Sequence, residues 1–385
     1  MLEEIKKELE QLAHEGQKRA LRDLEEVREG RIRIRGRWLV NLASNDYLGL
    51  ASRWKLDKIA ARFPGLVLGA GASRLLSGNH PLYPLLESCL EEAYQRPALV
   101  FSCGYMANLG VVTSLCGKKD VIFADKLVHA SLIDALKLSG AKFFRYPHLD
   151  LNALEALLKK YRPNYRRALI ISESVFSMDG DIPDLAGLIE LKKRYEALLF
   201  LDEAHAVGVF GNKGLGVAEE QGLVPQVDFL LGTFGKALGA YGAFLITHPE
   251  FKAYLINKAR PFIFTTALPP VVVAGAYLAF ETAQKMTLER RALRKTALNF
   301  RKELGIRISE TASQTPIIPV LVGENHKALA LSEELFKAGY FAPAIRPPTV
   351  PPGTARLRLS LSAAIPWAAL EKAASVINTF LTSAR

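Results

Sequence analysis

The chain has 385 residues, of which 49% are hydrophobic, so it can fill one large hydrophobic core or two. Its three cysteines, Cys89, Cys103 and Cys116, show no metal-ligand spacing and are odd in number, which argues against a zinc site or a disulfide framework and favours a reducing, cytoplasmic compartment. No apolar run approaches the length of a membrane span, and the charged N-terminus lacks the apolar core of a signal peptide. Membrane insertion and secretion are therefore not expected.

The N-terminal tenth of the chain is strongly basic, within a formal net charge of +11. Met1 begins an amphipathic charged helix, and eight cationic side chains follow: Lys18, Arg19, Arg22, Arg28, Arg31, Arg33, Arg35 and Arg37. We expect most of them to be solvated on a helical face and in a loop. The alternative is attraction of an anionic partner, such as a phosphorylated cofactor or an acidic carrier protein. Without interleaved aromatics or zinc-finger spacing, nucleic acid is not an expected partner.

Short apolar runs recur through the middle of the chain and alternate with helical patterns such as 152–161 and 185–196. The runs are 98–101, 121–124, 142–146, 168–172, 197–202, 228–232 and 243–247. Nearly continuous apolar strands that alternate with helices predict a mostly parallel sheet covered on both faces. The sequence therefore predicts one large α/β domain from about residue 50 to residue 280.

The C-terminal part of the chain shows a different pattern. One long helical stretch is expected from 271 to 304, because it is rich in Ala, Leu, Glu, Lys and Arg and has no late glycine before Gly305. Strands are then expected at 316–322 and 355–362, and helices at 325–338 and 368–382. This pattern predicts a second, small α+β unit.

Two predicted strands deliver ionisable residues at their carboxyl ends. The run 227–231 leads to Lys236, and the run 198–201 leads to Asp202 and His205. Ligands of open α/β sheets collect at the strand C-termini, so we expect these side chains to form a site. A lysine amine can form a Schiff base with a carbonyl substrate or with pyridoxal phosphate, whose ring nitrogen such sites hold against an aspartate.

Other residues in the same positions suit that cofactor. His205 can donate to its ring oxygen, Thr233 and Ser177 carry hydroxyls for the phosphate, and His129 can lie over the ring. Gly104 and the residues from Tyr105 onward offer free backbone amides at a helix start, which is an anion site. Each residue alone has an ordinary structural explanation, such as a solvated lysine or a capping aspartate. Their joint placement favours a cofactor site over a non-catalytic binding protein on the same fold.

Several motifs resemble the α-oxoamine synthases, in order and at that family's spacing from about residue 15 to the C-terminus. They are NDYLGL at 45–50, GAGASR at 69–74, SGN at 77–79, FSMDGD at 176–181, DEAH at 202–205 and TFGK at 233–236. These are pyridoxal-phosphate enzymes of the aspartate-aminotransferase fold (fold type I). They join an amino acid to an acyl thioester with loss of carbon dioxide.

The resemblance implies an N-terminal segment at 1–45, a large α/β domain with a mostly parallel seven-stranded sheet at 46–283, and a small α+β domain at 284–385. It also implies a set of catalytic residues. Lys236 is the Schiff-base lysine, Asp202 the partner of the ring nitrogen, His205 the donor to the ring oxygen and His129 the ring stacked on the cofactor. Further cofactor contacts are implied at Gly104, Tyr105, Ser177 and Thr233.

The remaining implied residues contact substrates or the neighbouring subunit. Arg358 matches the arginine that binds the carboxylate of the amino acid, a role suited to a bidentate guanidinium. Arg22, Asn45 and Thr349 match substrate-binding positions, the first and last of them for the acyl substrate. Thr266 matches a residue that reaches the phosphate in the neighbouring subunit, which implies a homodimer with composite active sites. No metal is implied.

The stretch 345–358 most resembles the branch of the family that condenses L-alanine with a pimeloyl thioester in biotin biosynthesis. The acyl donor is coenzyme A or an acyl-carrier protein, and the basic N-terminal region is compatible with either. Branches that use glycine or serine share the cofactor residues and stand as the alternative. Tyr83 and Ile365 occupy positions where relatives often carry histidine.

Overall fold

The computed structural model describes residues 1–306 and 315–383, and the chain forms two compact units. The larger unit comprises Arg53–Ser177 and Asp181–Arg290. The smaller unit comprises Met1–Ser52, Met178–Gly180 and Arg291–Arg385. The expected domain limits at residues 45 and 283 stay a prediction.

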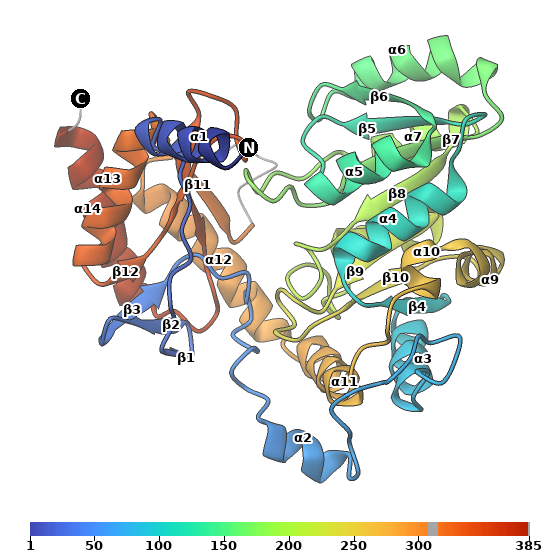
Figure 1. Ribbon diagram of the computed structural model, residues 1–385, viewed down its shortest axis with the longest axis horizontal. Coiled ribbons are helices and arrows are strands. Elements are labelled where there is room, and N and C mark those ends of the chain that lie inside the picture. Colours follow the sequence, from blue (N-terminus) through green and yellow to red (C-terminus); the bar gives the residue numbers. More distant parts are fainter. Residues whose placement is uncertain (307–314, 384–385) are drawn as a thin grey trace. The chain divides into compact units, whose positions relative to one another are not determined.

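A seven-stranded sheet forms the centre of the larger unit (Figure 1). In spatial order its strands are β4 (Ala98–Phe101), β10 (Ala243–Ile246), β9 (Phe229–Thr233), β8 (Leu198–Asp202), β7 (Ala168–Glu173), β5 (Val121–Asp125) and β6 (Lys142–Tyr146). The pairs from β9 to β6 are parallel, whereas β10 is antiparallel to both of its neighbours. The predicted mostly parallel sheet is confirmed, and each expected apolar run forms a strand.

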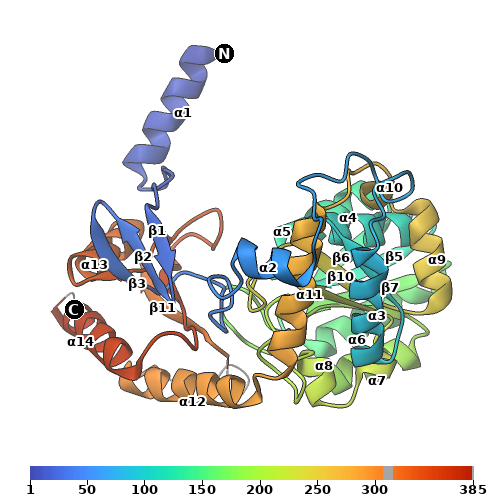
Figure 2. The ribbon, with the colours of Figure 1, turned by 90° about the horizontal axis from the view of Figure 1, so that it is seen from below.

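Helices cover both faces of this sheet, which is why its strands are apolar on both sides. The helices of the larger unit are α2 (Leu56–Arg62), α3 (Leu82–Tyr94), α4 (Gly104–Leu115), α5 (Ala130–Ser139), α6 (Leu151–Tyr161), α7 (Leu185–Arg194), α8 (Val217–Glu220), α9 (Pro249–Lys258), α10 (Arg260–Ile263) and α11 (Pro270–Gln284). Figure 2 shows α4 and α10 on one side of the sheet and α6 and α7 on the other.

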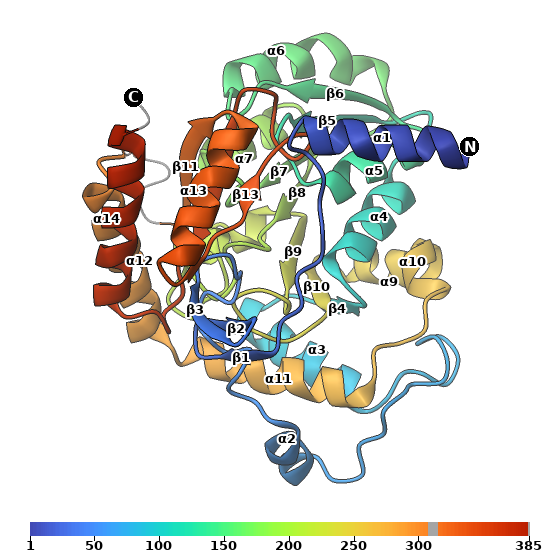
Figure 3. The ribbon, with the colours of Figure 1, turned by 60° about the vertical axis from the view of Figure 1, so that its left-hand side comes forward.

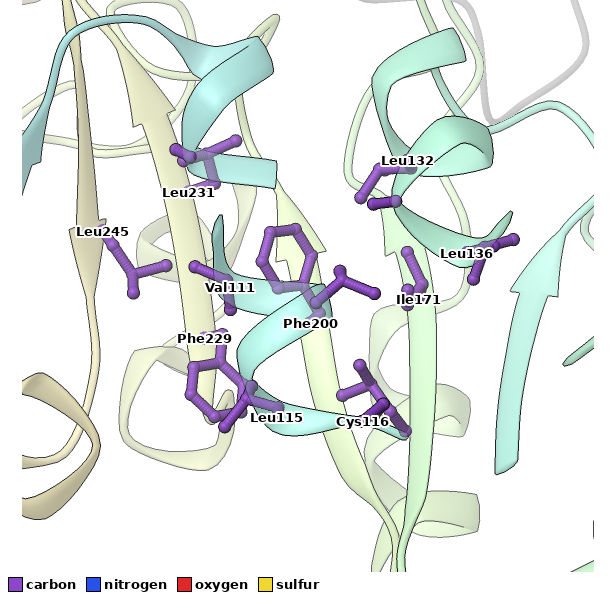
Figure 4. Close-up of a cluster of buried hydrophobic side chains, with 14 of the residues drawn as sticks. Val111, Leu115, Cys116, Leu132, Leu136, Ile171, Phe200, Phe229, Leu231 and Leu245 are labelled. Atoms are coloured by element: carbon purple, nitrogen blue, oxygen red, sulfur yellow. The ribbon is translucent and has the colours of Figure 1, made fainter. Parts of the chain in front are cut away.

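The main hydrophobic core lies between the sheet and the helices α4 and α5 (Figure 4). Val111 and Leu115 of α4 and Leu132 of α5 point into it, and Phe200 and Phe229 meet them from the sheet. All of these side chains are almost fully buried. On the opposite face aromatic rings pack together, with Phe144 of β6 stacked on Tyr161 of α6 at 4.0 Å between centroids and Phe244 of β10 against Phe280 of α11.

The parallel register brings several strand ends to one edge of the sheet. Glu173 of β7 pairs with Asp202 of β8, and Asp202 pairs with Leu231 of β9, two residues before Thr233. Because these strands run in the same direction, the polar residues that end them lie along a common edge. This edge carries the candidate site.

Where the structure describes the smaller unit, it contains two short sheets and four helices, of which one begins in the larger unit. One sheet has the order β1 (Glu26–Arg28), β2 (Arg31–Ile34), β3 (Arg37–Asn41), β12 (Tyr340–Phe341), and the other has the order β11 (Ile317–Gly323), β14 (Ala355–Ser360), β13 (Ala344–Ile345). The helices are α1 (Leu2–His14), α12 (Thr287–Glu303), α13 (Asn325–Lys337) and α14 (Trp367–Ser383). Helix α13 packs against the second sheet and against α14 (Figure 3). The expected small α+β arrangement is confirmed.

The expectation of a helical face and loop is wrong for the basic residues from Arg28 to Arg37, which lie in β1, β2, β3 and their turns. Along Arg31–Ile34 the isoleucines are buried and the arginines are exposed or half-buried. That alternation has the two-residue period of a strand. Ile32 and Ile34 pack with Leu39 in a small core of their own.

The single helix expected from 271 to 304 is also wrong, because Lys285 and Met286 separate α11 from α12. The amide of Met286 bonds to the carbonyl of Ala283 at 3.1 Å, which tightens the last turn of α11. The Arg290 guanidinium also donates to that carbonyl and to Thr287 Oγ1 at 3.0 Å. A side chain from the next helix therefore satisfies the end of α11, which composition alone does not reveal.

Within residues 1–306 and 315–383, no helix combines the length and the apolarity that a bilayer crossing requires.

We expect Leu132→Ala to lower the free energy of unfolding by about 2–5 kcal/mol, because Leu132 is fully buried in the main core. Leu138→Ala on the same helix is the matched control, since that side chain is 69% exposed, and we expect a change within about 0.5 kcal/mol. Urea unfolding followed by circular dichroism measures both variants. Equal effects would contradict this placement of α5.

Candidate functional site

A cavity of about 180 Å³ opens at the carboxyl edge of the large sheet. Its walls come from the strand ends, from the start of α4 and from the residues that open α5. They are Gly104, Tyr105, Asn108, His129, Ser131, Glu173, Asp202, Ala204, His205, Leu231, Thr233 and Lys236. Sites for drug-sized ligands occupy roughly 300–1,000 Å³, so this cavity suits a compact molecule.

Lys236 reaches the cavity from a tight turn that follows β9. The turn is held by Gly235 N, which donates to Thr233 Oγ1 at 3.2 Å, and by Ala240 N, which donates to the carbonyl of Phe234 at 2.8 Å. The Phe234 ring is fully buried, whereas Lys236 is half-buried. The turn therefore uses Phe234 as an anchor and leaves the lysine at the cavity wall.

Asp202 and His129 are the two ends of a short chain of hydrogen bonds. Asn108 Nδ2 donates to Asp202 Oδ2 at 3.1 Å and to Ser131 Oγ at 2.9 Å, and Ser131 Oγ lies 2.8 Å from His129 Nδ1. The other Asp202 oxygen accepts from Ala204 N at 2.9 Å. These bonds orient a carboxylate that is 6% exposed and a histidine on the wall of the same cavity.

Burial and neighbouring charges tune the ionisable groups here. Burial lowers the pKa of His129, and the positive charge of Lys236 acts in the same direction, while Asp202 opposes them. Burial also raises the pKa of Glu173 well above its usual range, and the Asp202 charge adds to that effect. Glu173 accepts a hydrogen bond from His129 N at 2.5 Å. Asp202 and Glu173 are thus two buried carboxyl groups on the wall of one cavity.

Two features of the cavity fit a polar ring compound with an anionic group. Asn108 Oδ1 is buried and has no hydrogen-bond partner among the described residues, so it is available to a ligand or to water. At Gly104 an added Cβ would meet nothing within 4 Å, so the first turn of α4 presents its amides to open space. Free amides at a helix start bind anions.

Tyr105 and His205 complete the set that the structure brings together. The Tyr105 ring stands edge-on to His129, with 6.4 Å between centroids, and its hydroxyl donates to Asp134. His205 is buried, at 5% exposure, in the loop after β8. Both line the cavity, as the sequence analysis expected for cofactor contacts.

Two expected cofactor residues are not among the described residues that line this cavity. Ser177 lies at the end of the larger unit's first segment, beyond the buried residues Val175 and Phe176. Thr266 forms an isolated β-bridge with Ser73 and lines a separate, very small cavity beside Tyr83.

The expected substrate arginine is a buried residue of the smaller unit. Arg358 on β14 donates to Asn45 Oδ1 at 2.8 Å, to Tyr47 Oη at 3.1 Å and to the Ser360 hydroxyl at 2.5 Å. Burial raises the pKa of Tyr47, and the Arg358 charge opposes that shift. These three bonds orient the planar guanidinium.

The two residues expected at the acyl substrate also belong to the smaller unit. The Arg22 guanidinium lies over the rings of Phe336 and Phe341, at 5.9 and 5.5 Å from their centroids. Thr349 Oγ1 accepts a hydrogen bond from Arg19 at 3.0 Å. Each position therefore has one arginine: Arg22 itself, and Arg19 bonded to Thr349.

Sequence reasoning missed Asn108, Ser131 and Glu173. Asn108 lies one helical turn after Gly104, so it faces the same side of α4. Ser131 follows His129 by two residues, and Glu173 ends β7 as Asp202 ends β8. The place of Glu173 at the site could have been predicted, because the ends of parallel strands share an edge of the sheet. Among the described residues, no cluster of three or more His, Cys, Asp or Glu side chains is arranged to hold a metal ion.

The chain matches the family model of aminotransferase class I and II over residues 37–377. It is 48% identical over 364 residues to a protein of Glaesserella parasuis that is provisionally named 8-amino-7-oxononanoate synthase, covering 92% of this chain and 94% of the relative. Relatives of the same provisional name from Haemophilus influenzae are 45% identical.

Solved structures of two enzymes are similar to this fold. Serine palmitoyltransferase from S. paucimobilis, with a bound adduct of pyridoxal phosphate and myriocin, matches with a TM-score of 0.90 and 30% identity over 98% of this chain and 97% of that one. The 8-amino-7-oxononanoate synthase of Francisella tularensis matches with a TM-score of 0.77 and 28% identity over 90% of this chain and 98% of that one.

With a family match over most of its length and curated relatives at 48% identity, the chain belongs to the aminotransferase class I and II family and, within it, to the α-oxoamine synthases.

Proposed function

We propose that the chain condenses L-alanine with a pimeloyl thioester to give 8-amino-7-oxononanoate, carbon dioxide and the free thiol, a step of biotin biosynthesis. The observation that carries this proposal is the cavity that Lys236, Asp202 and His129 share. The names of the relatives at 45–48% identity support the choice of substrates. The cofactor is pyridoxal 5'-phosphate, in keeping with the family and with the solved structures that contain it.

The residues of the cavity supply what this cofactor needs. Lys236 would hold its aldehyde carbon covalently, Asp202 its ring nitrogen, and His205 its ring oxygen. Gly104 and Tyr105 at the start of α4, with Thr233, would hold the phosphate, and Ser177, which does not line the cavity, is proposed to reach the phosphate as well. When bound, the cofactor supplies an electron sink for the electron pair that proton removal leaves on the amino acid.

Lys236 is also proposed to act as the base. Its Nζ would remove the α-proton of L-alanine and would return a proton to the same carbon after that carbon has attacked the thioester carbonyl and carbon dioxide has left. Asp202 is suited to its role because it is 6% exposed and its oxygens accept from Asn108 and from the Ala204 amide. These bonds keep a negative charge against a protonated ring nitrogen.

His129, on the cavity wall, is proposed to lie over the ring and to donate to the carbonyl oxygen of the acyl group. Its orientation comes from Ser131 Oγ at 2.8 Å and from the bond between its backbone amide and Glu173. A hydrogen bond to that oxygen stabilises the negative charge that develops during attack.

Arg358 is proposed to bind the carboxylate of L-alanine, while Asn45 holds the guanidinium at 2.8 Å. Arg22 and Thr349 are proposed to meet the pimeloyl chain, whose free carboxylate suits the arginine. The donor is a thioester of coenzyme A or of an acyl-carrier protein.

We further propose that two chains form a homodimer with composite sites. The support is the position of Thr266, which lies outside the cavity of its own chain and matches the residue that reaches a neighbour's phosphate. The alternative function is that of another α-oxoamine synthase that uses serine or glycine. The 0.90 TM-score with serine palmitoyltransferase favours that alternative over an unrelated activity.

With pyridoxal phosphate added, we expect a visible absorbance band from covalent attachment to Lys236, and no such band in Lys236→Ala. Addition of L-alanine should change the band, and pimeloyl-CoA should then release coenzyme A and carbon dioxide. Glycine and L-serine are the comparison substrates. A response to one of them but not to L-alanine would reject the proposed substrate and keep the family, whereas absence of any band would reject the cofactor site.

Arg358→Lys keeps the charge but loses the planar fork, so we expect the KM for L-alanine to rise by about tenfold or more. Steady-state kinetics at saturating pimeloyl-CoA measure this change. Arg167→Lys, at an exposed arginine of the larger unit, is the control and should leave KM unchanged. An unchanged KM in Arg358→Lys would remove this residue from the amino-acid site.

Mixed dimers test the composite site. Lys236→Ala and Thr266→Asp are each expected to be inactive as homodimers, the second because its carboxylate repels the phosphate. A co-expressed mixed dimer contains one site with both native residues, so activity should return. Failure of the mixture to recover activity, with both chains folded and associated, would contradict the proposed role of Thr266.

A further inference from the structure

His148 lies between two carboxylates, outside the cavity described above. Its Nδ1 is 2.8 Å from Asp125 Oδ1, and its Nε2 is 2.7 Å from Asp181 Oδ2. Asp125 ends β5, and His148 follows the end of the neighbouring strand β6 by two residues. The trio therefore belongs to the same edge of the sheet as the candidate site.

The geometry requires a doubly protonated ring. A carboxylate oxygen only accepts hydrogen bonds, and a neutral imidazole has one donor nitrogen and one acceptor nitrogen. A neutral His148 would thus set a lone pair against one of the two carboxylates, whereas the imidazolium donates to both. Burial opposes the charge, but the bonds and charges of Asp125 and Asp181 outweigh it and raise the pKa of His148 to about 10.

Backbone amides hold the Asp125 carboxylate of the trio in place. Asp125 is 1% exposed and accepts from Leu127 N at 2.8 Å and from Leu149 N at 2.9 Å. Two other buried groups interact electrostatically with Asp125. They are the phenol of Tyr146, whose pKa burial raises, and the carboxyl group of Glu173. Among the described residues, Asp125 and Asp181 are the charged groups that hydrogen-bond to the His148 ring. His148 is therefore the cation that offsets their charge.

His148 contacts both ends of the segment 176–181, which carries Ser177. The Phe176 ring stands edge-on to the imidazole, with 4.4 Å between centroids, and Asp181 bonds to it directly. The segment is also closed on itself, because Phe176 N donates to the carbonyl of Asp181 at 3.0 Å. A rigid His148 therefore fixes the base of this loop.

The tip of the loop has its own constraints within the smaller unit. Asp179 forms an ion pair with Arg356, two residues before Arg358 on β14. Gly180 has a φ of +73°, and an added Cβ there would lie 2.5 Å from Thr315 Oγ1. Asp179 and Gly180 at the tip of the loop are thus constrained. The position of the Ser177 side chain therefore depends on the base of the loop, where His148 contacts Phe176 and Asp181.

We propose that His148, as an imidazolium between Asp125 and Asp181, is a positioning residue that holds the loop 176–181 so that the Ser177 hydroxyl can bind the cofactor phosphate. This role rests on the proposed function, because it takes Ser177 to be a phosphate contact. His148 itself touches neither substrate nor cofactor.

The first test compares His148→Gln with His248→Gln. His248 is an exposed histidine that pairs with one carboxylate, Glu250, so it controls for loss of a histidine. In the apoprotein, hydrogen exchange of the peptide 174–182 should be about tenfold faster in His148→Gln and unchanged in the control. The dissociation constant for pyridoxal phosphate, measured by fluorescence, should rise by about tenfold or more.

Each outcome decides between explanations. Faster loop exchange together with weaker cofactor binding supports the proposal. Faster exchange with unchanged binding overturns the link from the loop to the phosphate, and unchanged exchange overturns the role of His148. If the wild-type protein binds no pyridoxal phosphate, the proposed function fails first, and the exchange data still report whether His148 holds the loop.

The second test does not depend on the folding of His148→Gln. Asp181→Asn keeps an oxygen that can accept the His148 proton but removes one charge, so we expect the pKa of His148 to fall towards 6.5. Nitrogen-15 NMR of the ring measures this shift against the wild-type protein, in which the ring should stay doubly protonated through pH 8. A wild-type His148 that titrates near pH 6.5 would overturn the proposal.

The raised pKa also sets the pH dependence of stability. The ion pairs of His148 contribute fully below pH 6.5, the ordinary pKa of an unfolded histidine, and the contribution is lost as pH rises through about 10. The difference in melting temperature between the wild-type protein and His148→Gln should therefore shrink from pH 7 to pH 10.5. A difference that stays constant over this range would contradict a charged His148.

Discussion

The parallel pairing of β5, β7, β8 and β9 is the constraint on which the rest of the site depends. Backbone hydrogen bonds between parallel strands set which residues are neighbours, and they bring Asp125, Glu173, Asp202 and Thr233 to one edge. The apolar bodies of these strands are buried by helices on both faces, so charged residues lie at the strand ends, and Asp125, Glu173 and Asp202 lie at the carboxyl ends. A slip of one residue in any of these pairings would turn a carboxylate into the core.

Burial makes this edge chemically useful, and neighbouring groups keep it stable. Three carboxylates, Asp125, Glu173 and Asp202, are each at most 6% exposed. The cost of burying a carboxyl group is offset differently at each of them. Asp125 pairs with His148, Glu173 has a raised pKa, and Asp202 accepts hydrogen bonds from Asn108 and from a backbone amide. Unpaired charges in such positions would be strongly destabilising. The same edge therefore holds the carboxylate that is proposed to meet the cofactor, Asp202, and two further carboxyl groups next to it.

Much of this arrangement was predictable from the sequence, and the failures have physical causes. The apolar runs predicted all seven strands of the large sheet, because buried parallel strands need nearly continuous apolar sequence. The basic stretch from Arg28 to Arg37 was misread, since short strands with long cationic side chains have weak apolar signals. The break between α11 and α12 was missed because it depends on the Arg290 side chain, which bonds to a carbonyl seven residues earlier.

By itself, the sequence determined the fold class, the order of the strands along the chain and the residue types at each strand end. These depend on local periodicity and on motifs whose members are close together. Only the tertiary structure decided that Asn108 and Ser131 join Asp202 to His129, and that His148 bonds to both Asp125 and Asp181. Apart from Ser131 and His129, those partners are separated by 23 to 94 positions in the chain, and no local pattern records a contact that the packing of distant segments creates.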